Sequence, residues 1–264
     1  MKRSSLFVIQ LLFTLLVCAF MLVPVVMSLL AGLTRNFFVG LSSGLTFDWL
    51  IQVWQAYSPT VWLSLQLALA CAVCVGVIGV PAAYALVRMN NRFSRAFEEL
   101  MVLPVAMPGL ASALALLLTY GQFGTFRSSW LFILVGHVLF TLPFLVRPVM
   151  AVMQRQQLPV LEEAAASLGA GPIKRFFSVV LPNCRAGILA GVLMVVTLSL
   201  GEFNLTWMLH TPMTKTLPVG LADSYASARL EIASAYTLIF LLMIVPLLVA
   251  LQAISARLSR GERR

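Results

Sequence analysis

The chain has 264 residues, of which 61% are hydrophobic and 10% are charged, and its formal net charge is +9. A soluble domain is about half apolar and about a quarter charged, so this composition excludes an ordinary soluble enzyme, a disordered chain and a small disulfide-stabilised domain. The apolar residues form long unbroken runs, which predict an all-α polytopic membrane protein rather than a β-barrel.

The first apolar run, Leu6–Leu30, follows Lys2-Arg3 in the manner of a signal peptide. It is longer than the ~7–15 apolar residues of a cleaved signal, and no small-residue cleavage site closes it. We therefore expect a retained signal-anchor helix, followed by an external stretch, Thr34–Tyr57. Residues 1–57 are predicted to be an addition to a core that spans residues 58–256, and residues 257–264 a basic cytoplasmic tail.

Five further apolar runs are long enough to cross about 30 Å of hydrocarbon as helices. Ser58-Pro59 is predicted to start the second span, with a capping hydroxyl and a proline in the first turn. Pro104 and Pro108-Gly109 are expected to break the third span. The six predicted spans are Leu6–Leu30, Pro59–Val87, Leu100–Tyr120, Leu131–Met153, Gly187–Leu209 and Ala233–Ser255.

The basic residues are distributed unevenly across these spans. Only Arg35, Arg127, Lys215 and Arg229 lie on one side, and the other fourteen of the 18 Lys and Arg residues lie on the opposite side. The positive-inside rule then places both termini in the cytoplasm. Topology therefore accounts for the net charge, and the dispersed basic residues, which no aromatic platform accompanies, give no indication of nucleic-acid binding.

The cytoplasmic segment between the fourth and fifth spans has its own predicted order. Glu162–Leu168 reads as a short Ala-rich helix, with acidic residues in its first turn, that stops at Gly169. Gly171-Pro172 predicts a turn, Ile173–Val180 predicts a second amphipathic helix, and Leu181-Pro182 is expected to redirect the chain into the membrane. We interpret this segment as a stiff element rather than a routine loop.

This arrangement resembles the EAA motif in the permease subunits of bacterial binding-protein-dependent ABC importers. In that motif, three residues separate Glu-Ala-Ala from a glycine, and nine more precede an aliphatic residue, any residue and Leu-Pro. The positions that match are Glu163, Ala164, Ala165, Gly169, Val179, Leu181 and Pro182. Val179 stands where the pattern prefers isoleucine. The resemblance extends over about the last 200 residues.

The resemblance implies a type I ABC importer permease-like core in the bacterial inner membrane. The motif would form a coupling helix in a groove of an ATPase subunit, where Glu163 pairs with a basic group and Gly169 permits a sharp exit. The implied partners are two ATPase subunits, a second permease subunit, a periplasmic solute-binding protein and membrane lipid. ATP-Mg would be bound by the ATPase, because this chain has no G-x-x-x-x-G-K-[ST] phosphate loop. The chain is thus expected to be a transport subunit and not an enzyme.

Polar residues inside the spans are candidates for the substrate pathway, because an ionisable group at membrane depth is costly. Glu202, with Phe203 and Asn204, is placed in the outer half of the fifth span, and His137 in the outer half of the fourth. Glu202 could meet a cationic substrate, pair with a basic residue of the partner permease, or only stabilise the bundle. His137 could instead be an interhelical hydrogen bonder.

Two other readings of the residues stay open. Cys71-x-x-Cys74 could be a redox or metal motif, but it lies in an apolar run without a second ligand pair, so apolar packing is favoured and no metal is predicted. Thr216-Leu217-Pro218 is similar to an external loop of the permease branch that serves polyamines, iron, sulfate and phosphonates.

The main alternative function is an ion-gradient-driven secondary transporter, which would need paired intramembrane charges and an inverted repeat. A third class, an intramembrane enzyme, is disfavoured because the sequence has only two histidines, no G-x-S-x-G motif and no acidic metal cluster.

Overall fold

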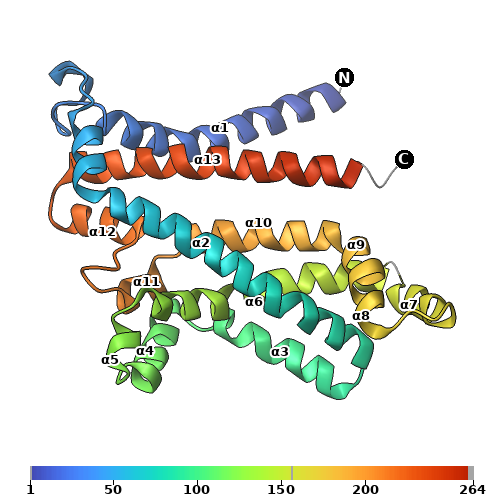
Figure 1. Cartoon of the computed structure of the whole chain (residues 1–264). Coiled ribbons are helices and arrows are strands. Elements are labelled where there is room, and N and C mark those ends of the chain that lie inside the picture. Colours follow the sequence, from blue (N-terminus) through green and yellow to red (C-terminus); the bar gives the residue numbers. More distant parts are fainter. Residues whose placement is uncertain (1, 156, 261–264) are drawn as a thin grey trace. The chain divides into compact units, whose positions relative to one another are not determined.

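The computed structural model describes residues 2–155 and 157–260. Within these ranges the chain is helical apart from its connections and one isolated β-bridge, between Thr34 and Leu45. Four of the described helices are long and apolar enough to cross a membrane, and there are up to six spans if each of two bent helix pairs counts as one. The predicted all-α membrane fold is therefore confirmed (Figure 1).

The chain forms two compact units, which we describe separately. Unit 1 consists of residues 2–59 and 220–242, and unit 2 of the remaining described residues. Three helices contribute to both units: α2 (Asp48–Met89), α12 (Leu217–Ala226) and α13 (Leu230–Arg260). The other elements are α1 (Lys2–Ala31) and η1 (Gly40–Ser43) in unit 1, and α3 (Arg92–Ala106), α4 (Gly109–Tyr120), α5 (Gly124–Arg127), α6 (Trp130–Arg155), α7 (Leu158–Ser167), α8 (Pro172–Arg175), η2 (Phe176–Val180), α9 (Leu181–Asn183), α10 (Arg185–Gly201) and α11 (Asn204–Leu209) in unit 2.

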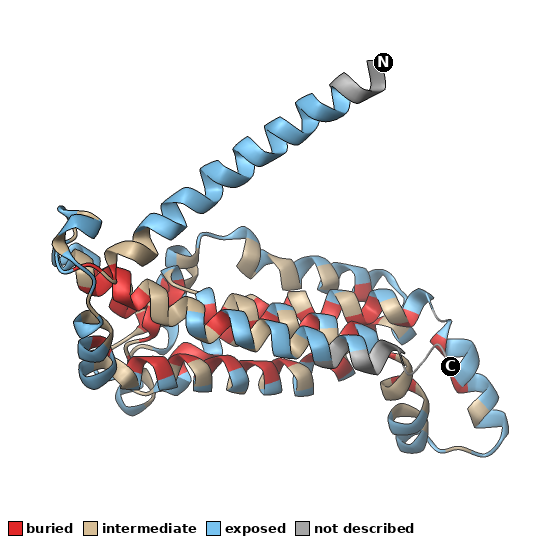
Figure 2. Ribbon diagram, turned by 90° about the horizontal axis from the view of Figure 1, so that it is seen from above, coloured by how far each residue is buried: buried red, intermediate tan, exposed pale blue. Residues whose placement is uncertain are grey.

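In unit 1, α1 is exposed along residues 6–27, as its pale blue ribbon in Figure 2 shows, and only its last turn is partly buried. Beyond that turn the chain approaches α13 closely, because a Cβ atom at Gly32 would lie 2.8 Å from the backbone nitrogen of Ala235. The Phe37 backbone N–H donates to Glu231 Oε1 over 2.9 Å, which ties the connection after α1 to the start of α13.

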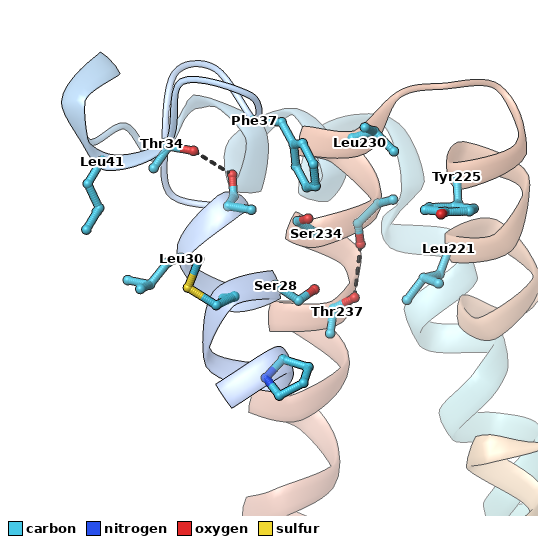
Figure 3. Close-up of a pocket in the computed structure, with 15 residues that line it drawn as sticks. Ser28, Leu30, Thr34, Phe37, Leu41, Leu221, Tyr225, Leu230, Ser234 and Thr237 are labelled. Carbon is cyan, nitrogen blue, oxygen red and sulfur yellow. Dashed lines mark hydrogen bonds between the residues drawn. The ribbon is translucent and has the colours of Figure 1, made fainter. Parts of the chain in front are cut away.

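A pocket of about 600 Å³ lies in unit 1 between the last turns of α1, the connection that follows it, and α12 and α13 (Figure 3). The Thr34 and Thr237 hydroxyls at its wall donate to the backbone carbonyls of Ala31 and Ala233. These hydroxyls are therefore used locally, and much of the remaining lining is apolar.

In unit 2, α6 packs against α10 through glycines. A Cβ atom at Gly187 would lie 2.8 Å from the Pro148 carbonyl oxygen, and one at Gly191 would lie 2.8 Å from Leu145 Cα. Gly187 and Gly191, four residues apart on one face of α10, therefore form a packing surface within the chain, because only glycine lets the two backbones approach so closely.

Two features that the sequence predicts from its prolines differ in the structure. The second span begins at Asp48 and runs through Ser58-Pro59, so the predicted start there is wrong; proline is tolerated inside a membrane helix. The third span is two helices bent by 103°. Pro104 stays inside α3, and the break falls at Pro108, whose predecessor Met107 is extended at φ −84° and ψ 143° because a residue before proline disfavours the helical region.

The ends of other elements also differ. The fifth span is interrupted after Gly201, Leu217 and Pro218 of the loop-like Thr216-Leu217-Pro218 segment begin the helix α12, and α13 continues to Arg260. The first residues of the predicted basic tail are therefore helical, and residues 261–264 lie outside the described residues.

The two ends of unit 2 differ in the elements that they gather. The end of α2, the start of α3, the end of α6 and the elements from α7 to α9 lie at one end, whereas α4, α5 and α11 lie at the other (Figure 1). Arg88, Arg92 and Arg155 belong to the first of these ends by their positions in α2, α3 and α6.

Candidate functional site

The segment of residues 158–183, here called the elbow, contains the predicted EAA motif. Its first limb, α7, begins after Gln157, which has a left-handed φ of +50°, and Pro159 occupies the first turn. Glu162 and Glu163 therefore lie in the middle of α7, and the prediction that they occupy its first turn is wrong. The helix begins earlier because proline is favoured in a first turn.

The predicted stop at Gly169 is confirmed. Gly169 has φ +83°, its N–H donates to the Ala166 carbonyl over 2.9 Å, and the Ala170 N–H donates to the Ala165 carbonyl over 3.0 Å. This pair of bonds is the Schellman motif, in which a left-handed residue closes the helix and satisfies its last carbonyls. Glycine adopts that conformation at the lowest cost, so the motif glycine sets the sharp exit from α7.

The second limb is continuous but irregular. It runs through α8, the π-helical turn η2 and α9, so Val179 lies in η2 and Leu181-Pro182 in α9. The Asn183 side-chain amide donates to the Val179 carbonyl over 2.7 Å. The change of direction, 71°, falls between Asn183 and Arg185, just after the predicted Leu181-Pro182 position. Pro182 cannot donate a backbone hydrogen bond, which disfavours a regular helix through this point.

The exposed surface of the elbow carries several large apolar side chains. Leu168 is 89% exposed and Ile173 is 76% exposed, and Leu161 is also exposed. Glu163 and Ala164 are exposed beside them, and Ala165 is half-buried. We call the exposed residues Leu161, Glu163, Ala164, Leu168 and Ile173 the elbow face. Clustered exposed apolar side chains are typical of surfaces that contact another molecule.

The inward side of α7 is anchored by Leu158 and Glu162, both buried. The Tyr84 hydroxyl, on α2, donates to Glu162 Oε1 over 2.5 Å, and Arg88 Nη1 donates to the Tyr84 hydroxyl over 2.9 Å. Arg88 Nη1 also lies 3.6 Å from Glu162 Oε1. The motif does not single out Glu162, because it assigns only the second of two adjacent acids. A tyrosine and an arginine one turn apart on α2 are the sequence features that could have indicated the contact.

The predicted pathway residues lie at a break in the fifth span. Glu202 separates α10 from α11, and its carboxylate accepts the Leu205 N–H at Oε1 and both the N–H and the hydroxyl of Thr206 at Oε2, over 2.7 to 2.8 Å. Glu202 thus serves as the cap of α11, which supports the structural alternative for this acid.

His137 is buried and hydrogen-bonded at both ring nitrogens. Nδ1 lies 2.8 Å from the Ser199 hydroxyl and Nε2 lies 2.8 Å from the Thr206 hydroxyl. Its Nε2 is also 3.8 Å from Glu202 Oε2. The structure therefore brings two predicted residues together, and it favours the interhelical hydrogen-bonding role for His137.

A cavity of about 420 Å³ opens beside this break. Glu202 and Asn204 line it from the break, Ser112 and Thr119 line it from α4, and Phe140 lines it from α6. Ser112 Oγ is buried, and no hydrogen-bond partner occurs among the described residues. Phe203 is half-buried, with its ring centroid 5.3 Å from that of Trp207. The polar residues that a solute could contact here are therefore Glu202, Asn204 and hydroxyls of α4.

Cys71 and Cys74 are free thiols on α2 and are not joined by a disulfide. Cys71 is buried, its sulfur lies 3.2 Å from the Thr141 hydroxyl, and the four cysteines are free thiols. Within the described ranges, no group of three or more His, Cys, Asp or Glu side chains is placed to hold a metal ion.

Comparison with known proteins relates this chain to transport permeases. The family model described as "Binding-protein-dependent transport system inner membrane component" matches residues 75–261. The chain is 30% identical over 209 residues to the putrescine transport system permease protein PotI of Escherichia coli K12, covering 76% of this chain and 74% of that protein. It is 29% identical over 215 residues to the sulfate transport system permease protein CysW of Synechocystis, covering 76% and 78%.

Among solved structures, a chain of the inward-facing MetNI methionine ABC transporter aligns with a TM-score of 0.61 and 16% identity, covering 76% of this chain and 94% of that chain. This likeness concerns the fold and supports the predicted type I arrangement. The family model covers most of the sequence, from Val75 onward. This multi-pass inner-membrane protein therefore belongs to the family of binding-protein-dependent transport system inner membrane components, the permease subunits of ABC importers.

Proposed function

We propose that this permease forms half of a solute pathway and that a separate ATPase drives it through the elbow. The observation that carries the proposal is the two-sided character of α7. Leu158 and Glu162 are buried, whereas Leu161, Ala164 and Leu168 are exposed. A short helix that is anchored on one side and apolar on the other suits a surface that docks on a partner.

The chemistry of the elbow face fits a groove in an ATPase subunit. Ala164 has a small side chain, so the backbone of α7 can approach a partner closely, and the exposed Glu163 carboxylate can pair with a basic group there. Two ATPase subunits would bind below the membrane, one for each permease, and ATP-Mg would be bound by those subunits. ATP would bind more tightly to the closed conformation of the ATPase pair, and it would therefore shift the equilibrium between open and closed complexes toward closure. Closure of the ATPases would draw the two elbows together.

The same proposal includes a second permease subunit and a periplasmic solute-binding protein. One core of this size supplies only part of the wall of a pathway, and the family takes its description from binding proteins. The elbow end of unit 2 would face the cytoplasm, because Arg88, Arg92 and Arg155 gather there. With six spans, an even number, both termini would then lie on that same side of the membrane.

The cargo would be a small polar solute, of the polyamine, phosphonate or iron-like kind. PotI is named for putrescine, a cation, and CysW for sulfate, an anion, so family membership alone does not set the sign of the charge. The cavity beside the α10–α11 break is the proposed contact site, with Glu202 and Asn204 in its wall and Phe203 and His137 supporting the break.

Co-purification with the ATPase tests the docking proposal. The tagged permease would be co-expressed with a candidate ATPase subunit from the same organism, and the ATPase recovered in detergent would be measured. Ala164→Trp places a bulky side chain in the elbow face, so we expect recovery to fall by roughly tenfold or more, as for a perturbed interface hot spot.

Ala96→Trp is the matched control, because Ala96 is also exposed, on α3, but lies outside the elbow face. It should leave the recovery unchanged. Full ATPase recovery with Ala164→Trp would contradict docking at this face. Solute uptake by the permease alone in liposomes, driven by an ion gradient, would favour the secondary transporter instead.

A further inference from the structure

We propose that Tyr84, Glu162 and Arg88 form a link that passes movement of the elbow into α2, with Glu162 as its positioning residue. The inference rests on the proposed function, because it assumes that an ATPase moves the elbow. It adds a second role for the acidic pair of α7: Glu163 faces the partner, and Glu162 connects the helix to the membrane core.

Glu162 is the polar anchor of α7. It is 3% exposed, and the only other buried residue described in this helix is Leu158, one turn earlier. Leu158 packs through non-directional apolar contact, whereas the Glu162 carboxylate accepts a short hydrogen bond from the Tyr84 hydroxyl. A hydrogen bond to an ionised group is shorter and about twice as strong as a neutral one. The attachment of α7 to α2 therefore has a fixed geometry.

Tyr84 joins both limbs of the elbow to α2. Its hydroxyl holds Glu162 in the first limb, and its ring meets the Phe176 ring of the second limb edge-on, with centroids 5.3 Å apart and planes at 63°. A displacement of either limb therefore acts on the same side chain of α2.

Arg88 completes the link from the next turn of α2. Its guanidinium donates to the Tyr84 hydroxyl and lies 5.7 Å from the Tyr84 ring centroid, and its charge lies 3.6 Å from the Glu162 carboxylate. Tyr84 can accept this bond while it donates to Glu162, so the three groups form a chain without an unsatisfied carboxylate. Separating them would leave a buried charged group without its partners, which is costly. We therefore infer that the elbow and the end of α2 move together.

Spin-label distance measurements in the assembled complex test this link. The complex of this permease with its ATPase, second permease and binding protein would be compared without nucleotide and with ATP-Mg plus orthovanadate. One label pair, at Ser167 and Gln154, reports the elbow against α6, and a second pair, at Met89 and Gln154, reports α2 against α6. All three positions are exposed. The background carries Cys18→Ala and Cys74→Ala so that labels attach only where intended.

Tyr84→Phe is the informative variant, because it removes the hydroxyl and keeps the ring against Phe176. In the parent complex both distances should change with nucleotide. In Tyr84→Phe the elbow distance should still change, and the population with the shifted α2 distance should fall at least about tenfold, which corresponds to about 1.4 kcal/mol. Glu162→Gln keeps the shape of the side chain but removes the charge near Arg88, and should give a smaller loss.

Glu99→Gln is the matched control, since Glu99 is an exposed acid on α3, and it should behave like the parent. An α2 distance that changes as much in Tyr84→Phe as in the parent would overturn the link, as would an α2 distance that does not respond to nucleotide in the parent. If Tyr84→Phe still binds the ATPase in either case, docking through the elbow face stands and only the link fails.

Discussion

Replacement of Gly191 by alanine tests how closely α6 and α10 are packed. The added Cβ atom would lie 2.8 Å from Leu145 Cα, 3.0 Å from its Cγ and 3.2 Å from its Cβ. Carbon atoms in contact ordinarily lie about 3.5 to 4.0 Å apart, so the helices would have to separate by up to about 1 Å. Overpacking of this kind costs about 1 to 3 kcal/mol. The separation would also disturb His137 on α6 against Ser199 on α10.

Gly76→Ala is the matched control. A Cβ atom at Gly76, inside α2, would meet no described atom within 4 Å. Both substitutions gain the helix propensity of alanine over glycine, about 0.8 to 1 kcal/mol, so their difference isolates the packing cost. Thermal unfolding in one detergent would be followed by circular dichroism, and Gly191→Ala should unfold about 2 to 4 °C lower than Gly76→Ala for each kcal/mol. Equal unfolding temperatures for the two variants would refute the close packing of α6 and α10.

Three further predictions concern single contacts. Gly169→Ala places a Cβ atom at φ +83°, which costs about 1 to 2 kcal/mol; we expect weaker ATPase co-purification with normal membrane insertion, and unchanged recovery would argue against a role for this turn. Glu202→Gln cannot accept all three hydrogen bonds of the α11 cap, so thermal unfolding should show a loss of about 0.5 to 2 kcal/mol; a variant as stable as the parent would refute the capping role. Ser64→Ala removes the acceptor of the buried Leu217 N–H, at a cost of about 1 to 3 kcal/mol; exchange of that amide hydrogen should accelerate, and an unaltered rate would show that the bond contributes little.

The sequence predicts the helices of this fold well because membrane burial imposes long apolar runs. It predicts bends less well, since a proline marks a weak point without fixing an angle. Pro108 gave the location of the break between α3 and α4, but the 103° bend depends on the surrounding contacts. Pro59 gave a false helix start, because the same residue type is tolerated within the longer α2.

In the candidate site, too, the sequence predicts local backbone features but not contacts between distant residues. The spacing around Gly169 predicted a helix stop, because a left-handed residue is a local requirement. The motif could not show that Glu162 is buried against Tyr84, because that contact joins positions 78 residues apart in the sequence. Likewise, the sequence makes Glu202 a candidate only because an ionisable group is costly inside a membrane. Its capping role becomes visible only in the structure, where the Thr206 N–H lies just beyond the break and donates to its carboxylate.

Because Glu162 and Glu163 are adjacent but have different surroundings, the function of α7 should depend more on its number of residues than on its composition. Consecutive residues on an α-helix point about 100° apart, which turns Glu162 inward and Glu163 outward. Deleting one residue between Leu158 and Glu162 would rotate every later side chain by that amount and bring Glu163 toward Tyr84. An engineered elbow should therefore accept many changes of side chain on its surface, but no change in the count of residues that precede Glu162.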